Sequence, residues 1–161
     1  IFNRQASKTV AGRNKRRDNN FEFGTNPCSE IILRPFQFCN LSEVVVRAND
    51  SDEALLNKVE AATILGTMQA TLTSFKYLRR QWKDTTEKER LLGVSLTGIM
   101  DHQILAGDIH NITRLTELLK EMKQKAVEVN KMWAKRFGIN QATAITCVKP
   151  SGRISQQKIV S

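Results

Sequence analysis

The longest regular pattern in the sequence is an amphipathic run from Ile112 to Phe137. Its apolar residues recur at helical spacing on one face: Leu115, Leu118, Leu119, Met122, Ala126, Val129, Met132, Trp133 and Phe137. Gly138 follows, where a helix commonly ends. The run predicts one long helix whose apolar face, with its Met and aromatic side chains, packs into a core and does not contact a cofactor.

Two further helices are predicted upstream. The first spans residues 52–78, where Ser51 can act as N-cap and acidic residues such as Glu53 favour the positive end of the helix. The second is short, spans residues 84–92 and is expected to end at Gly93.

Short runs rich in β-branched residues predict strands at 31–33, 44–46, 94–98 and 142–148. The 94–98 run alternates apolar and small polar residues, which is typical of a strand whose polar face looks into a cavity or a barrel interior. Strands that alternate with helices indicate an α/β fold with parallel strands. Because a parallel sheet needs both faces covered, so few strands predict part of a larger sheet or barrel.

The net charge of +9 is concentrated at the start of the chain, since six of the 25 Lys and Arg residues and no acid lie in the first seventeen. These charges are not interleaved with stacking aromatic residues. The pattern therefore favours a solvated basic loop or tail and argues against a nucleic-acid-binding module. We predict a flexible basic segment at 1–20 and a folded domain at 21–161.

No apolar stretch is long enough for a membrane span, and no apolar run follows the basic start as in a secretory signal. Three cysteines, Cys28, Cys39 and Cys147, cannot all pair, and none has zinc-ligand spacing to His102 or His110. We predict a reducing, cytoplasmic environment without a disulfide scaffold or metal site. The two histidines are expected to face solvent or cap helices.

Cys28 and Glu30 lie two positions apart, after an Asn26-Pro27 turn. In an extended segment they would point to the same side and could address one ligand. A carboxylate raises the pKa of a neighbouring thiol and no His is close in sequence, so hydrogen-atom transfer suits this pair better than a thiolate nucleophile. On spacing alone the alternative stands that Cys28 is a small buried hydrophobe and Glu30 a surface charge.

Cys39 follows Cys28 by eleven positions and could approach it only if the chain doubles back, for which Pro35 provides a break. A buried, inert Cys39 is the alternative. Cys147 lies in an apolar strand pattern and is predicted as core. The segment 149–152, Lys-Pro-Ser-Gly, could turn backbone N–H groups toward an anion or could be an ordinary turn.

Four segments in this order resemble the C-terminal half of the catalytic barrel of ribonucleotide reductases. They are residues 23–33 (FGTNPCSEIIL), 38–44 (FCNLSEV), 91–102 (LLGVSLTGIMDH) and 149–152 (KPSG). The pattern is most similar to the adenosylcobalamin-dependent class II enzymes of the monomeric ribonucleoside-triphosphate reductase type. The resemblance covers about residues 21–152.

The resemblance implies a partial ribonucleotide reductase barrel, a half-barrel with a finger loop at its centre. Cys28 would be the thiyl radical that takes the 3′-hydrogen of the substrate ribose. Glu30 would remove the 3′-hydroxyl proton, and Asn26 would hydrogen-bond the substrate. Cys39 would be one member of the cysteine pair that reduces the 2′-carbon, its partner lying on an upstream strand where this chain has no cysteine.

Pro150, Ser151 and Gly152 would belong to the loop that holds the substrate phosphates, although Arg153 stands where the family usually has Thr. The implied cofactor is adenosylcobalamin, bound mainly by regions outside this chain. The implied partners are a ribonucleoside triphosphate and a thioredoxin-type or dithiol reductant, with no nucleic acid and no membrane. The product would be deoxyribonucleotides for DNA synthesis.

The chain begins at Ile1 without a methionine, and we interpret it as a fragment. The leading hypothesis is a catalytic-core portion of a ribonucleotide reductase, active when joined to the missing barrel half in the same or a separate chain. The alternative is a truncated, catalytically incompetent remnant that at most binds nucleotide.

Overall fold

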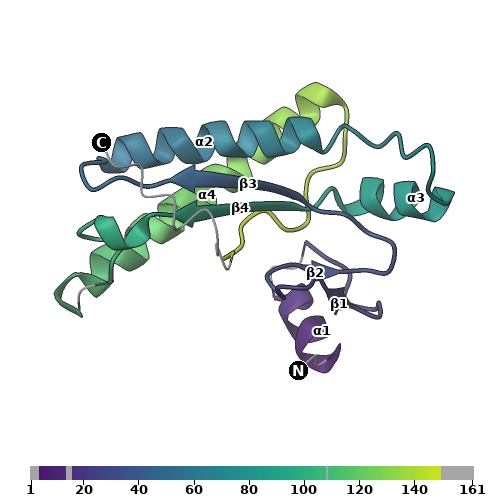
Figure 1. Ribbon diagram of the computed structural model, residues 1–161, viewed down its shortest axis with the longest axis horizontal. Coiled ribbons are helices and arrows are strands. Elements are labelled where there is room, and N and C mark those ends of the chain that lie inside the picture. The colour runs from purple at the N-terminus through teal and green to yellow at the C-terminus, as the bar shows by residue number, and fades with distance from the viewer. Residues whose placement is uncertain (1–3, 14–15, 108, 150–161) are drawn as a thin grey trace.

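The computed structural model describes residues 4–13, 16–107 and 109–149 (Figure 1). Its elements are α1 (Arg4–Gly12), β1 (Gly24–Thr25), β2 (Ile32–Leu33), β3 (Asn40–Val45), α2 (Asp52–Gln69), α3 (Arg80–Glu89), β4 (Leu92–Thr97), the 3-10 helices η1 (Ile99–Asp101) and η2 (Ile109–Asn111), and α4 (Ile112–Phe137). This is a mixed α/β arrangement, and the described residues form small sheets and no closed barrel. None of the described helices is both long and apolar enough to cross a membrane.

The two sheets have two strands each. β3 and β4 are parallel, with Asn40 opposite Leu92 and Val45 opposite Thr97, and α2 and α3 lie between them in the chain. β1 and β2 form an antiparallel hairpin. The α/β class with parallel strands is confirmed, while the half-barrel remains a prediction.

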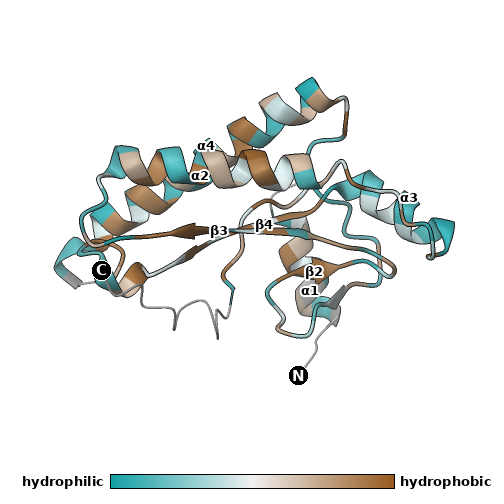
Figure 2. Cartoon of the chain, turned by 45° about the horizontal axis from the view of Figure 1, so that its top comes forward, coloured by the Kyte–Doolittle hydropathy of each residue, from teal (hydrophilic) through white to brown (hydrophobic). Residues whose placement is uncertain are grey.

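The core lies between the β3–β4 pair and the helices α2 and α4, which cover the same side of the strands (Figures 1 and 2). Figure 2 shows apolar residues concentrated in the two strands, whereas α3 is mostly hydrophilic. Alternation along each strand sends Val44, Leu92 and Val94 into this core. The opposite face, which we call the open face, carries Leu41, Glu43, Val45, Gly93, Ser95 and Thr97. Leu41 and Val45 there are 37% and 41% exposed.

The long helix was predicted at both ends. α4 spans Ile112–Phe137, and Gly138 ends it with φ 65°. α2 begins as predicted, because the Ser51 hydroxyl accepts the Ala54 N–H at 3.2 Å. Its predicted end at residue 78 is wrong: α2 ends at Gln69, and the Arg90 guanidinium donates to the Ala70 carbonyl just beyond it. This cap comes from a distant residue, so it left no local signal.

α3 also differs from the prediction. It spans Arg80–Glu89 and ends where Arg90 adopts a left-handed conformation with φ 47°. Gly93, the predicted stop, lies inside β4, where a Cβ would come within 2.4 Å of Leu41 Cδ2 and 3.1 Å of Cys147 Sγ. Gly93 is therefore explained by the close approach of its neighbours, not by helix termination.

The predicted strand at 142–148 is wrong as a regular strand. Its carbonyls at Ala144 and Ile145, two consecutive residues, accept the N–H groups of Leu92 and Val94 at 3.0 and 2.8 Å. Among the described residues of this segment, one regular bridge is formed, between Val94 and Thr146. Two residues of β4 therefore lie opposite a one-residue step of the segment, which is a bulge in the pairing and shifts the side-chain alternation after Ile145.

The predicted loop at 1–20 is wrong over Arg4–Gly12, which is the helix α1. Ala11 is buried, and it lines a hollow together with Ile31 and Ile32. Helix α1 is therefore packed against other parts of the chain, and the local composition of residues 1–20 does not reveal these tertiary contacts. The boundary between 1–20 and 21–161 remains a prediction.

Gly98, which follows β4, has φ 74°, and a Cβ there would lie 2.6 Å from the Val46 carbonyl oxygen. Gly98→Ala therefore combines left-handed strain with a clash against backbone. Gly107, with φ 87° and open space around it, is the matched control. We expect Gly107→Ala to cost about 1–2 kcal/mol of unfolding free energy and Gly98→Ala at least about 1 kcal/mol more. Equal costs in denaturant titrations of the two variants would contradict the clash.

Candidate functional site

The hairpin of β1 and β2 carries the predicted site at its tip, residues 26–31. The Asn26 side-chain oxygen accepts the Ile31 N–H at 3.0 Å, and its backbone carbonyl accepts the Ser29 N–H, also at 3.0 Å. Ser29 has φ 64°, a left-handed conformation that closes the turn. The tip is therefore a turn, and the prediction of an extended 28–30 segment is wrong. Since its oxygen is engaged, Asn26 would contact a ligand through its amide nitrogen.

Cys28 and Glu30 occupy different environments on this turn. The Cys28 thiol is exposed. Glu30 is half-buried, and its Oε2 atom is buried without a hydrogen-bond partner among the described residues. The turn therefore exposes the Cys28 thiol to solvent, while the Glu30 carboxylate on the same turn is partly buried.

Cys39 lies one residue before β3 and is half-buried. Burial raises the pKa of its thiol, and the nearby Glu30 carboxylate adds to this, while a backbone N–H and Lys149 act in the opposite direction. The antiparallel β1–β2 pair reverses the chain at the tip that carries Cys28, whereas the predicted doubling back at Pro35 stays a prediction. The structure therefore brings Glu30 to Cys39 and keeps the Cys39 sulfur a neutral thiol at neutral pH.

Cys147 was predicted as core and is not. The bulge places it on the open face, where its Sγ lies 3.1 Å from the position of a Cβ on Gly93. Burial raises the pKa of its thiol to about 11; Lys149 opposes the shift, and Glu30, Cys39 and Glu43 add to it. Two carboxylates and a second thiol thus help to raise the pKa of Cys147 at this face, a grouping that sequence spacing did not indicate.

The open face is polar along β4, as the alternation of 94–98 predicted. Ser95 is 2% and Thr97 5% exposed, and neither hydroxyl has a hydrogen-bond partner among the described residues. Glu43 is opposite Ser95 in the ladder, and it binds Lys149 Nζ at 3.1 Å. Lys149 immediately precedes the predicted phosphate loop, whose residues Pro150, Ser151 and Gly152 lie outside the described residues, as does Arg153.

A buried ionic cluster beside the hairpin was not predicted. It consists of Arg17, Arg34, Gln37 and Glu89, which we call the Arg17 cluster. Arg17 had been predicted as part of a solvated basic segment, but it forms a buried ion pair with Glu89 at 2.7 Å. Its partner is 72 positions away, so no local pattern could indicate it.

The histidines match the capping expectation in part. His102 is buried: its Nδ1 accepts the N–H groups of Ile104 and Leu105 at 3.3 Å, and its Nε2 lies 3.0 Å from the Asp50 carbonyl. It caps a turn and does not face solvent. His110 is exposed in η2.

The described residues do not fit a corrinoid cofactor on their own. Four hollows among the described residues have volumes of about 630, 440, 300 and 190 Å³, and none of these four is large enough to enclose a corrin with its nucleotide tail. In the same ranges no group of three or more His, Cys, Asp and Glu side chains is arranged to hold a metal ion.

Thiol alkylation tests the environments of the three cysteines. We expect iodoacetamide at pH 8 to modify exposed Cys28 first, and Cys39 and Cys147 much more slowly. Because burial raises the pKa of Cys147 to about 11, its alkylation rate should keep rising up to that pH. Peptide mass spectrometry across a pH series measures this, with denatured protein as the control. A Cys147 profile that levels off near pH 9 in the folded chain would contradict the structure.

Comparison with known proteins finds similarity to one kind of enzyme. A Lactobacillus acidophilus protein is 26% identical over 181 aligned residues, which cover 99% of this chain and 24% of that protein. A Lactobacillus leichmannii protein is 23% identical over 155 residues, 83% of this chain and 21% of that protein. A Lactobacillus helveticus protein is 24% identical over 159 residues, 86% of this chain and 21% of that protein. All three are named adenosylcobalamin-dependent ribonucleoside-triphosphate reductase.

These similarities confirm the resemblance inferred from the four motifs. The chain spans about a fifth to a quarter of the length of the curated relatives it matches. No protein-family model matches the chain, and no solved structure matches it.

Proposed function

We propose that this chain forms part of the catalytic core of a ribonucleoside-triphosphate reductase and that the β1–β2 hairpin is its finger loop. The observation that carries the proposal is the placement of three motif residues. An exposed thiol, Cys28, lies on a tight turn, and the Glu30 carboxylate on the same turn is near enough to the half-buried Cys39 thiol, which directly precedes β3, to help raise its pKa. The similarity to curated reductases supports the same assignment.

The proposed reaction starts with Cys28 as a thiyl radical. The sulfur takes the hydrogen atom from C3′ of the ribose, so an S–H bond forms and a C3′–H bond breaks. Glu30 accepts the proton of the 3′-hydroxyl, and the 2′-hydroxyl leaves as water. Two thiols, Cys39 and a partner from the upstream part of the barrel, supply two electrons, the proton that leaves with the 2′-hydroxyl as water and the hydrogen that C2′ gains, and they become a disulfide. Glu30 returns its proton to the 3′-oxygen. Cys28 then returns its hydrogen to C3′ and is a radical again.

The charges around the hairpin suit these roles. A carboxylate disfavours ionisation of neighbouring thiols, and the pKa of Cys39 is raised by burial and by Glu30. A neutral thiol can give a hydrogen atom and the resulting thiyl radical can take one, whereas a thiolate has no hydrogen atom to give. Glu30 Oε2, buried without a partner among the described residues, is an oxygen free to accept the ribose proton.

The remaining assignments follow the motifs. Asn26 would donate its amide to the substrate, and Pro150, Ser151 and Gly152 would hold the phosphates. Lys149 Nζ, now paired with Glu43, lies directly before that loop. A dithiol protein or small dithiol would reduce the disulfide after each turnover. The relatives' names indicate adenosylcobalamin dependence, and its binding would fall to regions beyond this segment.

A graft protein tests the proposal. In it, this chain replaces the matched segment of the Lactobacillus acidophilus relative, which aligns with 99% of the chain. The assay follows deoxynucleotide formation from a ribonucleoside triphosphate with adenosylcobalamin and a dithiol. We expect turnover by the graft. A folded graft that binds the triphosphate and forms no deoxynucleotide would favour the alternative, a catalytically incompetent remnant.

Cys39→Ser in the graft separates activation from reduction. In this variant Cys28 can still form a thiyl radical and start the reaction by taking the 3′-hydrogen, but one of the two reducing thiols is absent. We expect the triphosphate to be consumed while deoxynucleotide is not formed. Chromatography of both compounds from one reaction measures this, and normal deoxynucleotide yield from the variant would show that Cys39 is not a reductant.

A further inference from the structure

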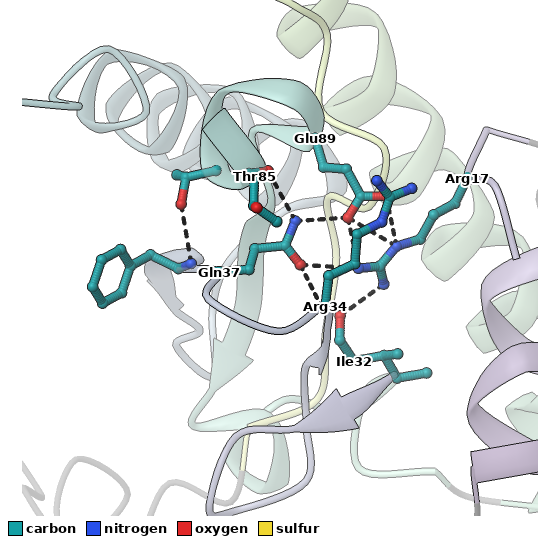
Figure 3. A network of polar contacts seen from close by, with 8 residues as sticks. Arg17, Ile32, Arg34, Gln37, Thr85 and Glu89 are labelled. Atoms are coloured by element: carbon teal, nitrogen blue, oxygen red, sulfur yellow. Dashed lines mark hydrogen bonds and ion pairs between the residues drawn. The ribbon is translucent and has the colours of Figure 1, made fainter. Parts of the chain in front are cut away.

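Resting on the proposed function, we propose that Arg17 is a positioning residue for the reaction: through the Arg17 cluster it fixes the hairpin that carries Cys28 against the start of the β3–β4 sheet. The four side chains of the cluster are buried, at 7% exposure for Arg17, 5% for Arg34, 4% for Gln37 and 1% for Glu89. They come from three stretches of the chain, at residue 17, residues 34–37 and residue 89, and converge on one another (Figure 3).

Arg17 connects the hairpin to the end of α3. Its Nε and Nη2 donate to the two oxygens of Glu89 at 2.9 and 2.7 Å, a two-bond pairing that fixes orientation as well as distance. Its Nη1 donates to the Ile32 carbonyl of β2 at 2.7 Å, and its Nη2 also reaches Gln37 Oε1 at 3.1 Å. One guanidinium therefore contacts β2, α3 and the segment that leads into β3.

The other members complete the connection. Arg34 follows β2 directly and pairs with Glu89 at 2.9 Å. Gln37 donates to Glu89 at 2.7 Å and accepts the Arg34 N–H at 2.8 Å. Because Gln37 lies three residues before β3 and Glu89 three residues before β4, the cluster stands where both parallel strands begin.

The incoming arm of the hairpin is held by the same guanidiniums. Arg17 lies over the Phe23 ring at 4.6 Å, and Arg34 over the Phe21 ring at 3.6 Å. Phe23 is buried and immediately precedes β1. Both arms of the hairpin are thus tied to one cluster, while β1 and β2 themselves pair over only two residues each.

This arrangement matters for hydrogen-atom transfer, since reacting atoms must be held within a fraction of an ångström and a small misplacement is costly. The hairpin is too short to be rigid by itself. The Arg17 cluster supplies the missing constraint between the hairpin that carries Cys28 and the β3–β4 sheet, which begins one residue after Cys39.

Hydrogen exchange of the full chain tests the positioning without requiring activity. Arg17→Met removes the hydrogen bond to Ile32 and the ion pair with Glu89. Arg17→Lys keeps the positive charge but loses the two-bond guanidinium pairing with Glu89. Arg13→Met, at an exposed arginine outside the cluster, is the control. We expect Arg17→Met to speed exchange of the 24–33 amides by at least about tenfold, Arg17→Lys to speed it less, and Arg13→Met to leave it unchanged. Amides of α4 should change little.

Unchanged exchange at 24–33, or an equal increase at 24–33 and in α4, would overturn the positioning role. If Arg17→Met fails to fold, the Arg17→Lys measurement decides by the same criterion. In the graft, we expect Arg17→Lys to lower kcat while KM for the triphosphate stays the same. An inactive parent graft would contradict the proposed function and would not affect the hydrogen-exchange result.

Discussion

Cys28→Ser in the graft protein is expected to abolish deoxynucleotide formation. The serine O–H bond is too strong for an alkoxyl radical to form in place of the thiyl radical, so the 3′-hydrogen cannot be taken. Since Cys28 is exposed at the hairpin tip, exchanging sulfur for oxygen should leave folding intact. The loss should therefore appear in turnover and not in thermal unfolding.

Two controls accompany this variant. The unfolding temperature and the affinity for the triphosphate should match those of the parent graft, which separates chemistry from folding and binding. Parental turnover by Cys28→Ser would show that the residue does not carry the radical, and that the resemblance describes the fold alone.

Glu30→Gln in the graft is expected to lower kcat by roughly 10²–10⁴-fold, the usual effect of removing a general base. Glutamine keeps the size of the side chain and its hydrogen-bonding capacity, but it cannot accept the 3′-hydroxyl proton. The buried Oε2 atom of Glu30 has no partner among the described residues, so the change should break no ion pair there. Initial rates at saturating triphosphate measure the effect.

Glu53→Gln is the matched control for this variant. Glu53 is an exposed residue in the first turn of α2, remote in sequence from the hairpin. Its replacement should leave kcat unchanged. A Glu30→Gln graft as fast as the Glu53→Gln graft would remove Glu30 from the mechanism.

Features set by local sequence could be predicted, and α4 is the best example. Apolar periodicity defines its length and Gly138 its end, and both signals lie within the helix and its next residue. The Ser51 cap of α2 is local in the same sense. The end of α2 could not be predicted, because the cap at Ala70 comes from Arg90.

The site itself was only partly predictable. The roles of Asn26, Cys28 and Glu30 came from the resemblance, while spacing suggested an extended segment that the structure replaces with a turn at Ser29. Cys147 escaped prediction because a bulge reverses the alternation after Ile145. The Arg17–Glu89 pair escaped because a buried ion pair between residues 72 positions apart leaves no periodic trace.

If Cys28 begins the reaction by taking a hydrogen atom from C3′, an enzyme that incorporates this chain should discriminate between protium and deuterium at that position. The graft protein is given an equal mixture of a ribonucleoside triphosphate with protium and with deuterium at C3′, and the unreacted substrate is analysed by mass spectrometry at partial conversion. We predict that the protium form is consumed faster, so the remaining substrate becomes enriched in deuterium. Equal consumption of the two forms by an active graft would contradict hydrogen transfer from C3′ as proposed.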